Sequence, residues 1–293
     1  MKRSLAAVLL SLVAGLASPA GQARDRSILW AVDGSHNTVY LLGSIHVLRA
    51  GESALTETAE RAYEDAEQLV MEIDLDDPEL ADPVALLDAM REAALLPAGQ
   101  TLRRVLGSDY AAIRDRARQS GVDLEPLDPF APWFVATLLL QVELAKRGFL
   151  PELGIEQQLA GRAIADGKPI QGLETAEDQF AVLAGLSLAE QKRFLLMTLE
   201  ESADLDEQIA DLLGAWRSGD TAALGRALSD EFESFPELYR PLTEDRNRAW
   251  IDDLVELLDD RDDYLVVVGA LHLVGRNSVV DLLRQRGYTV TQQ

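Results

Sequence analysis

Two of the three histidines in this sequence end the same short pattern. His46 closes the run YLLGSIH at 40–46, and His272 closes the run VVVGALH at 266–272, so that each follows an apolar stretch and a glycine three residues upstream. Imidazole is the commonest metal ligand in proteins and the usual proton carrier near neutral pH. The pair therefore suits a metal centre or acid/base chemistry, and we interpret the two histidines as one site.

The apolar runs before these histidines are expected to be strands, because short continuous apolar runs are typical of buried strands. In open α/β sheets, the groups that touch ligands lie beyond the carboxyl ends of the strands. A glycine at that point lets the backbone turn, or approach a ligand closely, because it has no Cβ. Two such strand ends are expected to place both imidazoles in one cleft.

A third candidate, Glu72, lies in the run 68–75, which predicts a buried strand with acidic residues at its exit. A carboxylate between Met71 and Ile73 is costly to bury unless it pairs with a cation, a metal or a hydrogen-bond donor. A structural ion pair with an arginine is the alternative to a catalytic role. The aspartates that follow are expected to be solvated: Asp74, Asp76 and Asp77.

The third histidine, His36, belongs to a different kind of segment. It lies in the polar stretch 33–37 between two strand-like runs, 27–32 and 38–42, which together predict a β-hairpin. Because turns are normally solvated, we expect His36 to be an exposed loop residue and not a ligand.

The composition excludes several kinds of chemistry. Without cysteine, the chain has no disulfide, thiolate metal ligand, cysteine nucleophile or lipid-modified cysteine anchor. The formal net charge of −23 opposes binding to nucleic acid or to an anionic membrane surface. We therefore expect no nucleic-acid partner, and a fold stabilised by core packing.

The amino-terminal residues predict export. Lys2 and Arg3 precede an apolar run and then small residues, the pattern of a secretory signal peptide cleaved after Ala20 or Ala23. We expect residues 1–23 to be this signal, residues 24–293 to form a single domain, and the protein to be periplasmic or secreted. The apolar stretch 133–145 is too short for a membrane span, so we expect a core helix or a groove wall and no stable membrane anchor.

The order of the predicted elements indicates an α/β fold. A helix over 53–66, with Ser53 as its N-cap, and the strand 68–75 follow His46. Residues 78–260 are mostly helical by period, with one short strand at 169–173 that ends at Glu174. A strand at 264–268, a helix at 276–286 and a strand at 288–290 close the chain. We predict a mixed sheet built from two degenerate strand-Gly-x-x-His-helix-strand halves with a large helical insertion, which forms either a lid or a subdomain.

Motifs in order along the chain carry a resemblance to a known family. They are LWAV at 29–32, YLLGSIHVL at 40–48 with Glu72, GIE at 154–156, GKPIQGLET at 167–175, WRSGD at 216–220, Arg246-Asn247, VGALHLVG at 268–275 and GYTV at 287–290. The chain resembles the TraB/PrgY/GumN family, which is related to the Tiki metalloproteases, and within it the secreted bacterial GumN-like branch. The resemblance spans almost all of the chain beyond the signal.

This resemblance implies an α/β fold with a helical insertion, related at a distance to erythromycin esterases and a haem-binding lipoprotein. It also implies a divalent-metal-dependent protease whose site comprises the two Gly-x-x-His histidines and the strand glutamate, here His46, His272 and Glu72. Arg246 and Asn247 match the family's Arg-Asn pair. Two acidic residues match further acidic positions of the family: Glu156 and Glu174.

The leading hypothesis is a metallohydrolase acting on a peptide or another small periplasmic substrate. Zn²⁺, Mn²⁺ or Co²⁺ held by His46, His272 and Glu72 would lower the pKa of a bound water. Either Glu72 is a ligand and Glu174 is the general base, or Glu72 is itself the base. Arg246 is expected to stabilise the developing oxyanion or to orient a substrate carboxylate.

Two other functions remain open at the level of sequence. In the first, a metal-independent, esterase-like hydrolase uses His46 as general base with Glu72 orienting it. In the second, a periplasmic protein binds peptide, saccharide or haem without turnover, and both histidines are contact residues. Chelators separate the first from a metallohydrolase, because they would leave its activity intact.

Overall fold

The computed structural model describes residues 27–52, 55–77, 83–201, 205–232 and 236–293. The predicted signal peptide at 1–23 and the predicted helix cap Ser53 lie outside these residues. Within them, no helix is both long enough and apolar enough to cross a membrane. The most apolar stretch forms α5 (Pro132–Lys146), which is largely buried, so the prediction of a core helix there is confirmed.

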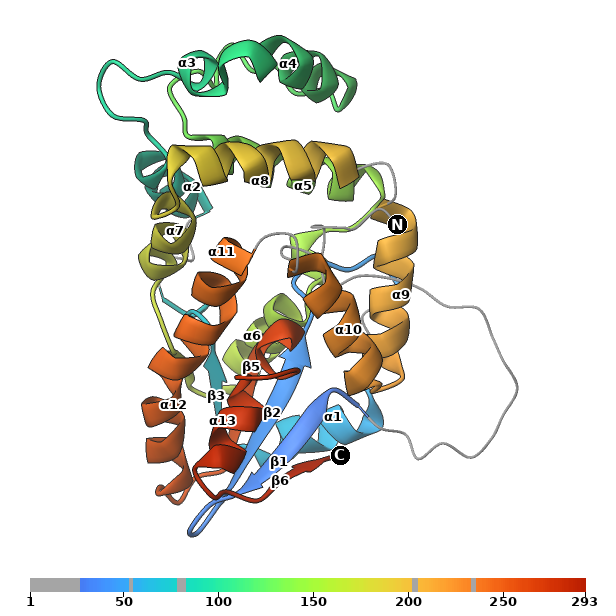
Figure 1. Ribbon diagram of the computed structural model, residues 1–293. Helices are drawn as coiled ribbons and strands as arrows, with labels where there is room; N and C mark the ends of the chain where they lie inside the picture. The colour runs from blue at the N-terminus through green and yellow to red at the C-terminus, as the bar shows by residue number, and fades with distance from the viewer. Residues whose placement is uncertain (1–26, 53–54, 78–82, 202–204, 233–235) are drawn as a thin grey trace.

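A six-stranded mixed sheet lies at the centre of the fold (Figure 1). Its spatial order is β4-β3-β5-β2-β1-β6, in which the first four strands run parallel and β1 is antiparallel to both of its neighbours. The strands are β1 (Leu29–Asp33), β2 (Thr38–Ser44), β3 (Gln68–Met71), β4 (Ile170–Gly172), β5 (Tyr264–Gly269) and β6 (Val290–Gln292). The predicted α/β class with a mixed sheet is confirmed.

The two Gly-x-x-His motifs follow neighbouring parallel strands. β2 pairs with β5 so that Gly43 lies opposite Val268 and Ser44 opposite Gly269. β5 is buried along its whole length, as expected for a parallel strand whose two faces are both covered. On its other side β5 pairs with β3, the strand that leads to Glu72. The three strand ends that carry the candidate residues are therefore adjacent.

The predicted hairpin is present at the amino end of the described chain. β1 and β2 pair in antiparallel register, and His36 is exposed in the turn between them. The neighbouring Asn37 holds the turn in place, because its amide donates to the carbonyls of Leu257, at 2.8 Å, and Asp262, at 2.7 Å. His36 thus lies at the edge of the sheet away from the other two histidines.

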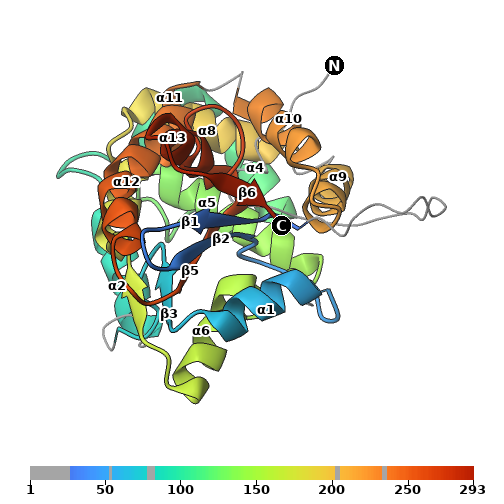
Figure 2. The ribbon, with the colours of Figure 1, turned by 90° about the horizontal axis from the view of Figure 1, so that it is seen from below.

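Helices cover both faces of the sheet. Figure 2 shows α1 and α6 on one side of it and α12 and α13 on the other. The helices are α1 (Glu57–Asp65), α2 (Pro83–Ala93), α3 (Leu102–Leu106), α4 (Tyr110–Gln119), α5, α6 (Ile155–Asp166), α7 (Ala176–Ala184), α8 (Leu188–Glu201), α9 (Leu205–Arg217), α10 (Thr221–Phe232), α11 (Pro236–Tyr239), α12 (Asp245–Leu258) and α13 (Val279–Gln285).

The helical segment contributes to two hydrophobic cores. One core contains the sheet with α1, α6, α9, α12 and α13, and the other contains α3, α4, α5 and α8, which lie beyond the carboxyl ends of the parallel strands (Figure 1). Leu271, in the second Gly-x-x-His motif, packs against both cores. The candidate site therefore lies where the two cores meet.

Several element boundaries differ from the sequence prediction. β3 ends at Met71 and not at Leu75. The chain then bends and passes close to Gly172, where an added Cβ would lie 2.6 Å from the backbone nitrogen of Asp74. α1 begins at Glu57, since the Thr56 side chain accepts a hydrogen bond from the Ala59 N–H and caps the helix there. Within the segment predicted to be mostly helical, a π-helical turn, Arg240–Glu244, joins α11 and α12 end to end.

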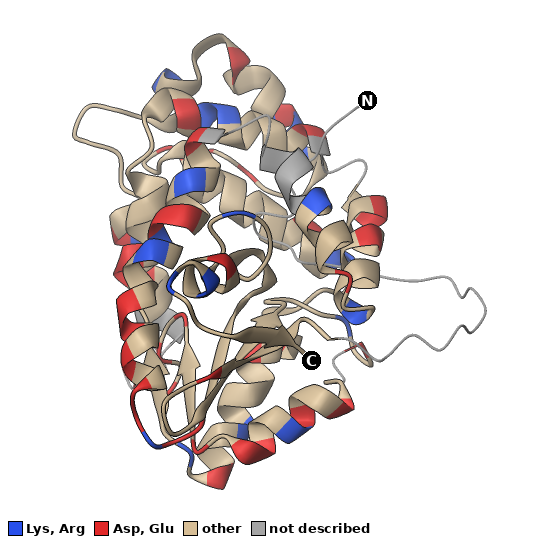
Figure 3. Cartoon of the chain, turned by 60° about the horizontal axis from the view of Figure 1, so that its bottom comes forward, with Lys and Arg blue, Asp and Glu red and all other residues tan. Residues whose placement is uncertain are grey.

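Acidic residues are spread over the surface of the molecule. Figure 3 shows them on helices of both cores, with basic residues interspersed among them. In this view the acidic residues do not gather on a single face.

Candidate active site at the strand ends

The structure brings the three leading candidates together. Glu72 comes directly after β3, His272 lies in the 3₁₀ turn that follows β5, and His46 lies two residues beyond β2. Gly269 marks their meeting point, because a Cβ added there would lie 3.2 Å from both Oε1 of Glu72 and Nε2 of His46. It would also lie 3.7 Å from the His272 ring.

Both motif glycines are needed for room. Neither adopts a positive φ, so the backbone conformation does not demand glycine at either position. A Cβ on Gly43 would lie 2.3 Å from the Ile28 side chain and 3.1 Å from Cα of Ala270, which shows that the two motifs pack directly on each other. The Trp216 indole N–H donates to the Gly43 carbonyl at 2.7 Å and fixes this approach.

His272 is held as a neutral, oriented ring. Its side chain is buried, and burial lowers its pKa to about 3. Its Nδ1 lies 2.6 Å from Oδ1 of Asn247, whose amide nitrogen donates to the Asn277 carbonyl at 2.9 Å. This leaves Oδ1 as the acceptor, so Nδ1 of His272 carries the proton and Nε2 presents a lone pair. The Trp250 ring packs on the imidazole at a centroid distance of 4.5 Å.

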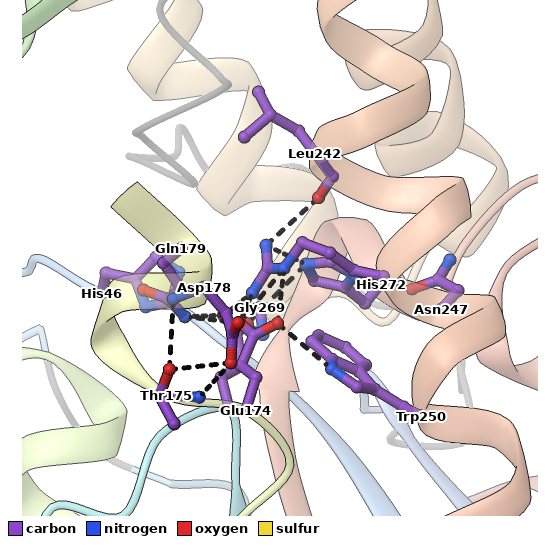
Figure 4. A network of polar contacts seen from close by, with 12 residues as sticks. His46, Glu174, Thr175, Asp178, Gln179, Leu242, Asn247, Trp250, Gly269 and His272 are labelled. Carbon is purple, nitrogen blue, oxygen red and sulfur yellow. Dashed lines mark hydrogen bonds and ion pairs between the residues drawn. The ribbon is translucent and has the colours of Figure 1, made fainter. Parts of the chain in front are cut away.

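Arg246 neutralises two buried carboxylates, Glu72 and Glu174. Figure 4 shows Glu174 in this network, with Gln179, Trp250 and His272 near it. The Arg246 guanidinium donates to Oε2 of Glu72 at 2.6 Å and, through Nε, to both oxygens of Glu174 at 3.1 Å. Nη1 of Arg246 contacts Nε2 of His272 at 3.1 Å and donates to the Leu242 carbonyl at 3.1 Å. The side chains of Glu72 and Glu174 are each 9% exposed, so these contacts are shielded from water.

These contacts keep Glu72 ionised. Burial by itself would raise the pKa of Glu72, but Arg246, the two histidines and the Gly269 N–H together hold that pKa well below its usual range. The Gly269 N–H donates to Oε1 at 2.7 Å, and Gln179 donates to Oε2 at 3.1 Å. A carboxylate with these partners remains an acceptor at neutral pH.

The oxygens of Glu174 are fully engaged. Gln179 donates to Oε1 at 2.8 Å, the Trp250 indole donates to Oε2 at 3.2 Å, and Arg246 contacts both. Glu174 lies two residues beyond β4, and the capping box of α7, made by Thr175 and Asp178, starts the helix directly after it. This places Glu174 as the counter-charge of Arg246.

His46 differs from His272 in its surroundings. Its side chain is 49% exposed, and its Nδ1 lies 2.6 Å from Oε1 of Glu156, in the first turn of α6. The Glu156 carboxylate raises the pKa of His46 to about 9, against the opposing effect of desolvation. Nε2 of His46 points toward Gly269 and Glu72, so the two imidazoles approach the same carboxylate from neighbouring strands.

Sequence reasoning missed three residues that complete the site. Gln179 links Glu72 to Glu174, Trp250 contacts both Glu174 and His272, and the Ser44 hydroxyl donates to Glu156. Trp250 lies four residues after Arg246, and this helical spacing places the two on one face, which is a signal that the sequence contains. Gln179 and Ser44 carry no comparable signal.

The amino end of α6 is locked against the loop that carries His46, and this contact predicts a strong effect of Gly154→Ala. A Cβ at Gly154 would lie 2.2 Å from the carbonyl oxygen of His46, and backbone atoms cannot move aside locally. We expect the substitution to lower the free energy of unfolding by about 1–3 kcal/mol. Gly161→Ala in the same helix is the control, since nothing lies within 4 Å of its Cβ, and it should stabilise the protein by about 0.5–1 kcal/mol.

Urea denaturation of both glycine variants at pH 7 is the measurement. Equal midpoints for Gly154→Ala and the parent would contradict the close packing of α6 on the His46 loop.

The donor set has the chemistry of a divalent-metal site but is not closed around one. Two imidazole Nε2 atoms and a carboxylate face one another, and each imidazole has its Nδ1 at an oxygen acceptor, as is usual for metal-binding histidines. Among the described residues, no three histidine, aspartate or glutamate side chains lie close enough together to hold an ion. The positive charge beside Glu72 and His272 belongs to Arg246.

Comparison with known proteins gives relatives of low identity over most of the chain. An uncharacterized protein of Escherichia coli, YbaP, is 27% identical over 247 residues, covering 84% of this chain and 87% of its own length. An uncharacterized protein of Treponema pallidum is 26% identical over 278 residues, covering 88% of this chain and 80% of its own.

A relative with a named activity is metalloprotease TIKI2 of Xenopus tropicalis, which is 25% identical over an alignment of 328 positions. The match covers 93% of this chain and 61% of that protein. No solved structure matches the chain. Residues 28–292, nearly everything that the structure describes, match the TraB/PrgY/gumN family. The chain therefore belongs to the TraB/PrgY/gumN family.

Proposed function

We propose that this protein is an exported hydrolase that cleaves an amide bond in a peptide, with a divalent cation that His46, Glu72 and His272 would hold after Arg246 moves away from His272 and the three side chains close around the ion. The observation that carries the proposal is the orientation of the imidazoles. Each has its Nδ1 bonded to an oxygen acceptor, and each directs Nε2 toward Glu72. The relationship to proteins named metalloprotease TIKI2 supports the same class of reaction.

The residues around the ligands have distinct roles in this proposal. Asn247 fixes the tautomer of His272, so that Nε2 is the nitrogen available to a cation. Arg246 keeps Glu72 ionised, and Glu174 holds Arg246 in place. Each oxygen of Glu174 accepts hydrogen bonds from two side chains, whereas Oε1 of Glu72 accepts from the Gly269 N–H and faces the two imidazoles. Glu72 is therefore the better candidate for the acceptor that a reacting water approaches. A bound cation would supply Lewis acidity, lowering the pKa of water and polarising the substrate carbonyl.

Arg246 is also the residue that offers a positive charge to the substrate. It is 14% exposed and donates to Nε2 of His272 as well as to both glutamates. A guanidinium here can stabilise negative charge on the substrate's carbonyl oxygen while water attacks. For this, the cation has to replace Arg246 as the partner of His272 Nε2. Its two carboxylate partners, Glu72 and Glu174, hold Arg246 near the site whether or not a cation is bound.

The contact between Arg246 and Nε2 of His272 favours a second candidate function. In a metal-independent hydrolase, Arg246 would remain where it is and His46 with Glu156 would form the proton-transfer pair. Glu156, and not Glu72, is the carboxylate within hydrogen-bond distance of His46. Activity that persists after chelation would select this candidate.

Metal binding is the experiment that tests the proposal. The chelator-treated protein is titrated with Zn²⁺, Mn²⁺ and Co²⁺ while the thermal midpoint and the bound metal are measured. We expect one ion per chain and stabilisation of about 2.7 kcal/mol when the free ion reaches 100 times its Kd. A peptide library is then incubated with the loaded and the stripped protein to detect cleavage.

The three histidines provide matched variants for this titration. His46→Ala and His272→Ala should abolish the rise in midpoint, whereas His36→Ala, at the exposed hairpin turn, should retain it. A parent protein that binds none of the three ions, or that keeps its binding in His46→Ala, would overturn the metal-dependent function.

A further inference from the structure

Glu156 makes a contact that neither the ligands nor the Arg246 network explains. It lies in the first turn of α6, more than a hundred positions along the chain from His46, and its Oε1 lies 2.6 Å from Nδ1 of that histidine. The Ser44 hydroxyl, at the end of β2, donates to the same oxygen. Oε1 of Glu156 thus accepts hydrogen bonds from both the His46 imidazole and the Ser44 hydroxyl, which lie at the end of β2.

The backbone holds Glu156 at that position. The Ile155 N–H donates to the Ile45 carbonyl at 3.0 Å, and Leu48 forms a bridge with Leu150 ahead of the helix. Gly154 allows the closest approach, because a side chain there would collide with the His46 backbone. The carboxylate is therefore fixed relative to the His46 loop through main-chain contacts on both sides.

His46 requires such a partner more than His272 does. The His272 ring is enclosed by Trp250, Asn247 and the surrounding core, so packing alone restricts its rotation. The His46 side chain is 49% exposed, and solvent leaves its ring free to turn unless a hydrogen bond fixes it. Its bond to Glu156 directs Nε2 toward Gly269 and Glu72.

The second oxygen of Glu156 shows that this residue is not placed for stability alone. Oε2 is buried and has no hydrogen-bond partner among the described residues. Leaving a buried polar atom unsatisfied costs about 1–3 kcal/mol, and more for a charged group. A residue that served only to fasten α6 to the sheet would not need to accept this cost, since an apolar side chain of similar size could pack there.

We propose that Glu156 is the positioning residue of His46: it fixes the ring through Nδ1 and thereby delivers Nε2 to the site. Ser44 holds the carboxylate in the rotamer that reaches the ring. The importance of this role for catalysis rests on the hydrolase function proposed above, but the positioning itself does not depend on a metal.

The test is an NMR measurement on the chelator-treated protein labelled with ¹⁵N and ¹³C at histidine. With three histidines in the chain, the ring signals can be assigned from single His→Ala variants. A carboxylate bonded to Nδ1 should give a downfield, slowly exchanging ring N–H proton for His46 and a ring as ordered as the backbone, with an order parameter of about 0.85.

Glu156→Ala should abolish that His46 proton signal and lower the order of the ring, and it should weaken Zn²⁺ binding by about 10–100-fold. Glu156→Gln, which keeps an acceptor oxygen, should retain the signal and most of the affinity. If the alanine variant fails to fold, Glu156→Leu, which keeps most of the side-chain volume without an acceptor oxygen, replaces it and should give the same losses. Glu152→Ala, an exposed acidic position just ahead of α6, is the control and should change neither measurement.

The outcomes separate this inference from the proposed function. A His46 signal and ring order that are unchanged in Glu156→Ala would overturn the positioning role, whatever the metal titration shows. Loss of the signal in Glu156→Ala, in a protein whose parent binds no ion, would support the positioning role and overturn the metal-dependent function.

Discussion

Replacing Arg246 by methionine is expected to lower the free energy of unfolding by about 3–5 kcal/mol, because it leaves two buried carboxylates without a cation. Glu72 and Glu174 are each 9% exposed, and Arg246 is the guanidinium that contacts both. Methionine preserves much of the side-chain volume, so the loss measures the missing charge more than a cavity. Urea denaturation at pH 7 is the measurement.

Arg248→Met is the matched control in the same helix. Arg248 is 44% exposed and pairs with Glu244 and Asp245 at the surface, where an ion pair contributes about 0–1 kcal/mol. Adding Glu174→Gln to Arg246→Met should recover part of the lost stability by removing one of the two unpaired charges. Similar losses for Arg246→Met and Arg248→Met would contradict the buried network.

The stability of the chelator-treated protein is expected to fall on both sides of about pH 6.5 because its two site histidines have opposite pKa shifts. The folded-state pKa of His272 is lowered to about 3. Below pH 6.5 the unfolded chain therefore binds a proton at this histidine, whereas the buried ring of the folded protein stays unprotonated. Acid then favours unfolding with a slope of about 1.4 kcal/mol per pH unit for this group.

The alkaline limb of the curve of stability against pH, where stability falls above pH 6.5, comes from His46. Its folded-state pKa is raised to about 9, so its contribution is fully present below 6.5 and is lost as the pH rises through 9. This limb should be the shallower one, because the side chain is 49% exposed and water screens its contact with Glu156.

Denaturation curves between pH 4.5 and 9 for the parent and two variants give the measurement. His272→Gln should remove the slope between pH 5 and 6, and His46→Gln should remove the slope between pH 7 and 9. His36→Gln is the control and should leave both limbs in place. A parent whose stability is constant from pH 5 to 6 would show that His272 is not held neutral by burial.

Much of the fold follows from local sequence. Apolar runs predicted the strands that became β1, β2 and β5, and the polar residues between the first two predicted their hairpin with His36 exposed. Periodicity predicted that residues 78–260 are mostly helical, and the described part of that segment contains α2 to α12. It did not predict the π-helical turn Arg240–Glu244 between α11 and α12, because a single turn is too short to establish a period of its own.

The repeated Gly-x-x-His motif already indicated which residues form the site. Two matched strand ends were expected at one edge of a sheet, and β2 and β5 are neighbours in parallel register. The burial of Glu72 was also readable, since a carboxylate between Met71 and Ile73 needs a partner. Those inferences depend on alternation and spacing along the chain, which the sequence specifies directly.

The partners of these residues were decided by tertiary structure alone. Arg246 joins Glu72 to Glu174, and Glu156 contacts His46, through loops and helices that lie far apart in the sequence. Two glutamates of similar context, 156 and 174, acquired different roles only because α6 lies against the β2 loop while β4 ends beside α12. The sequence of a segment specifies its own conformation, whereas the neighbour of a side chain depends on how all the segments pack.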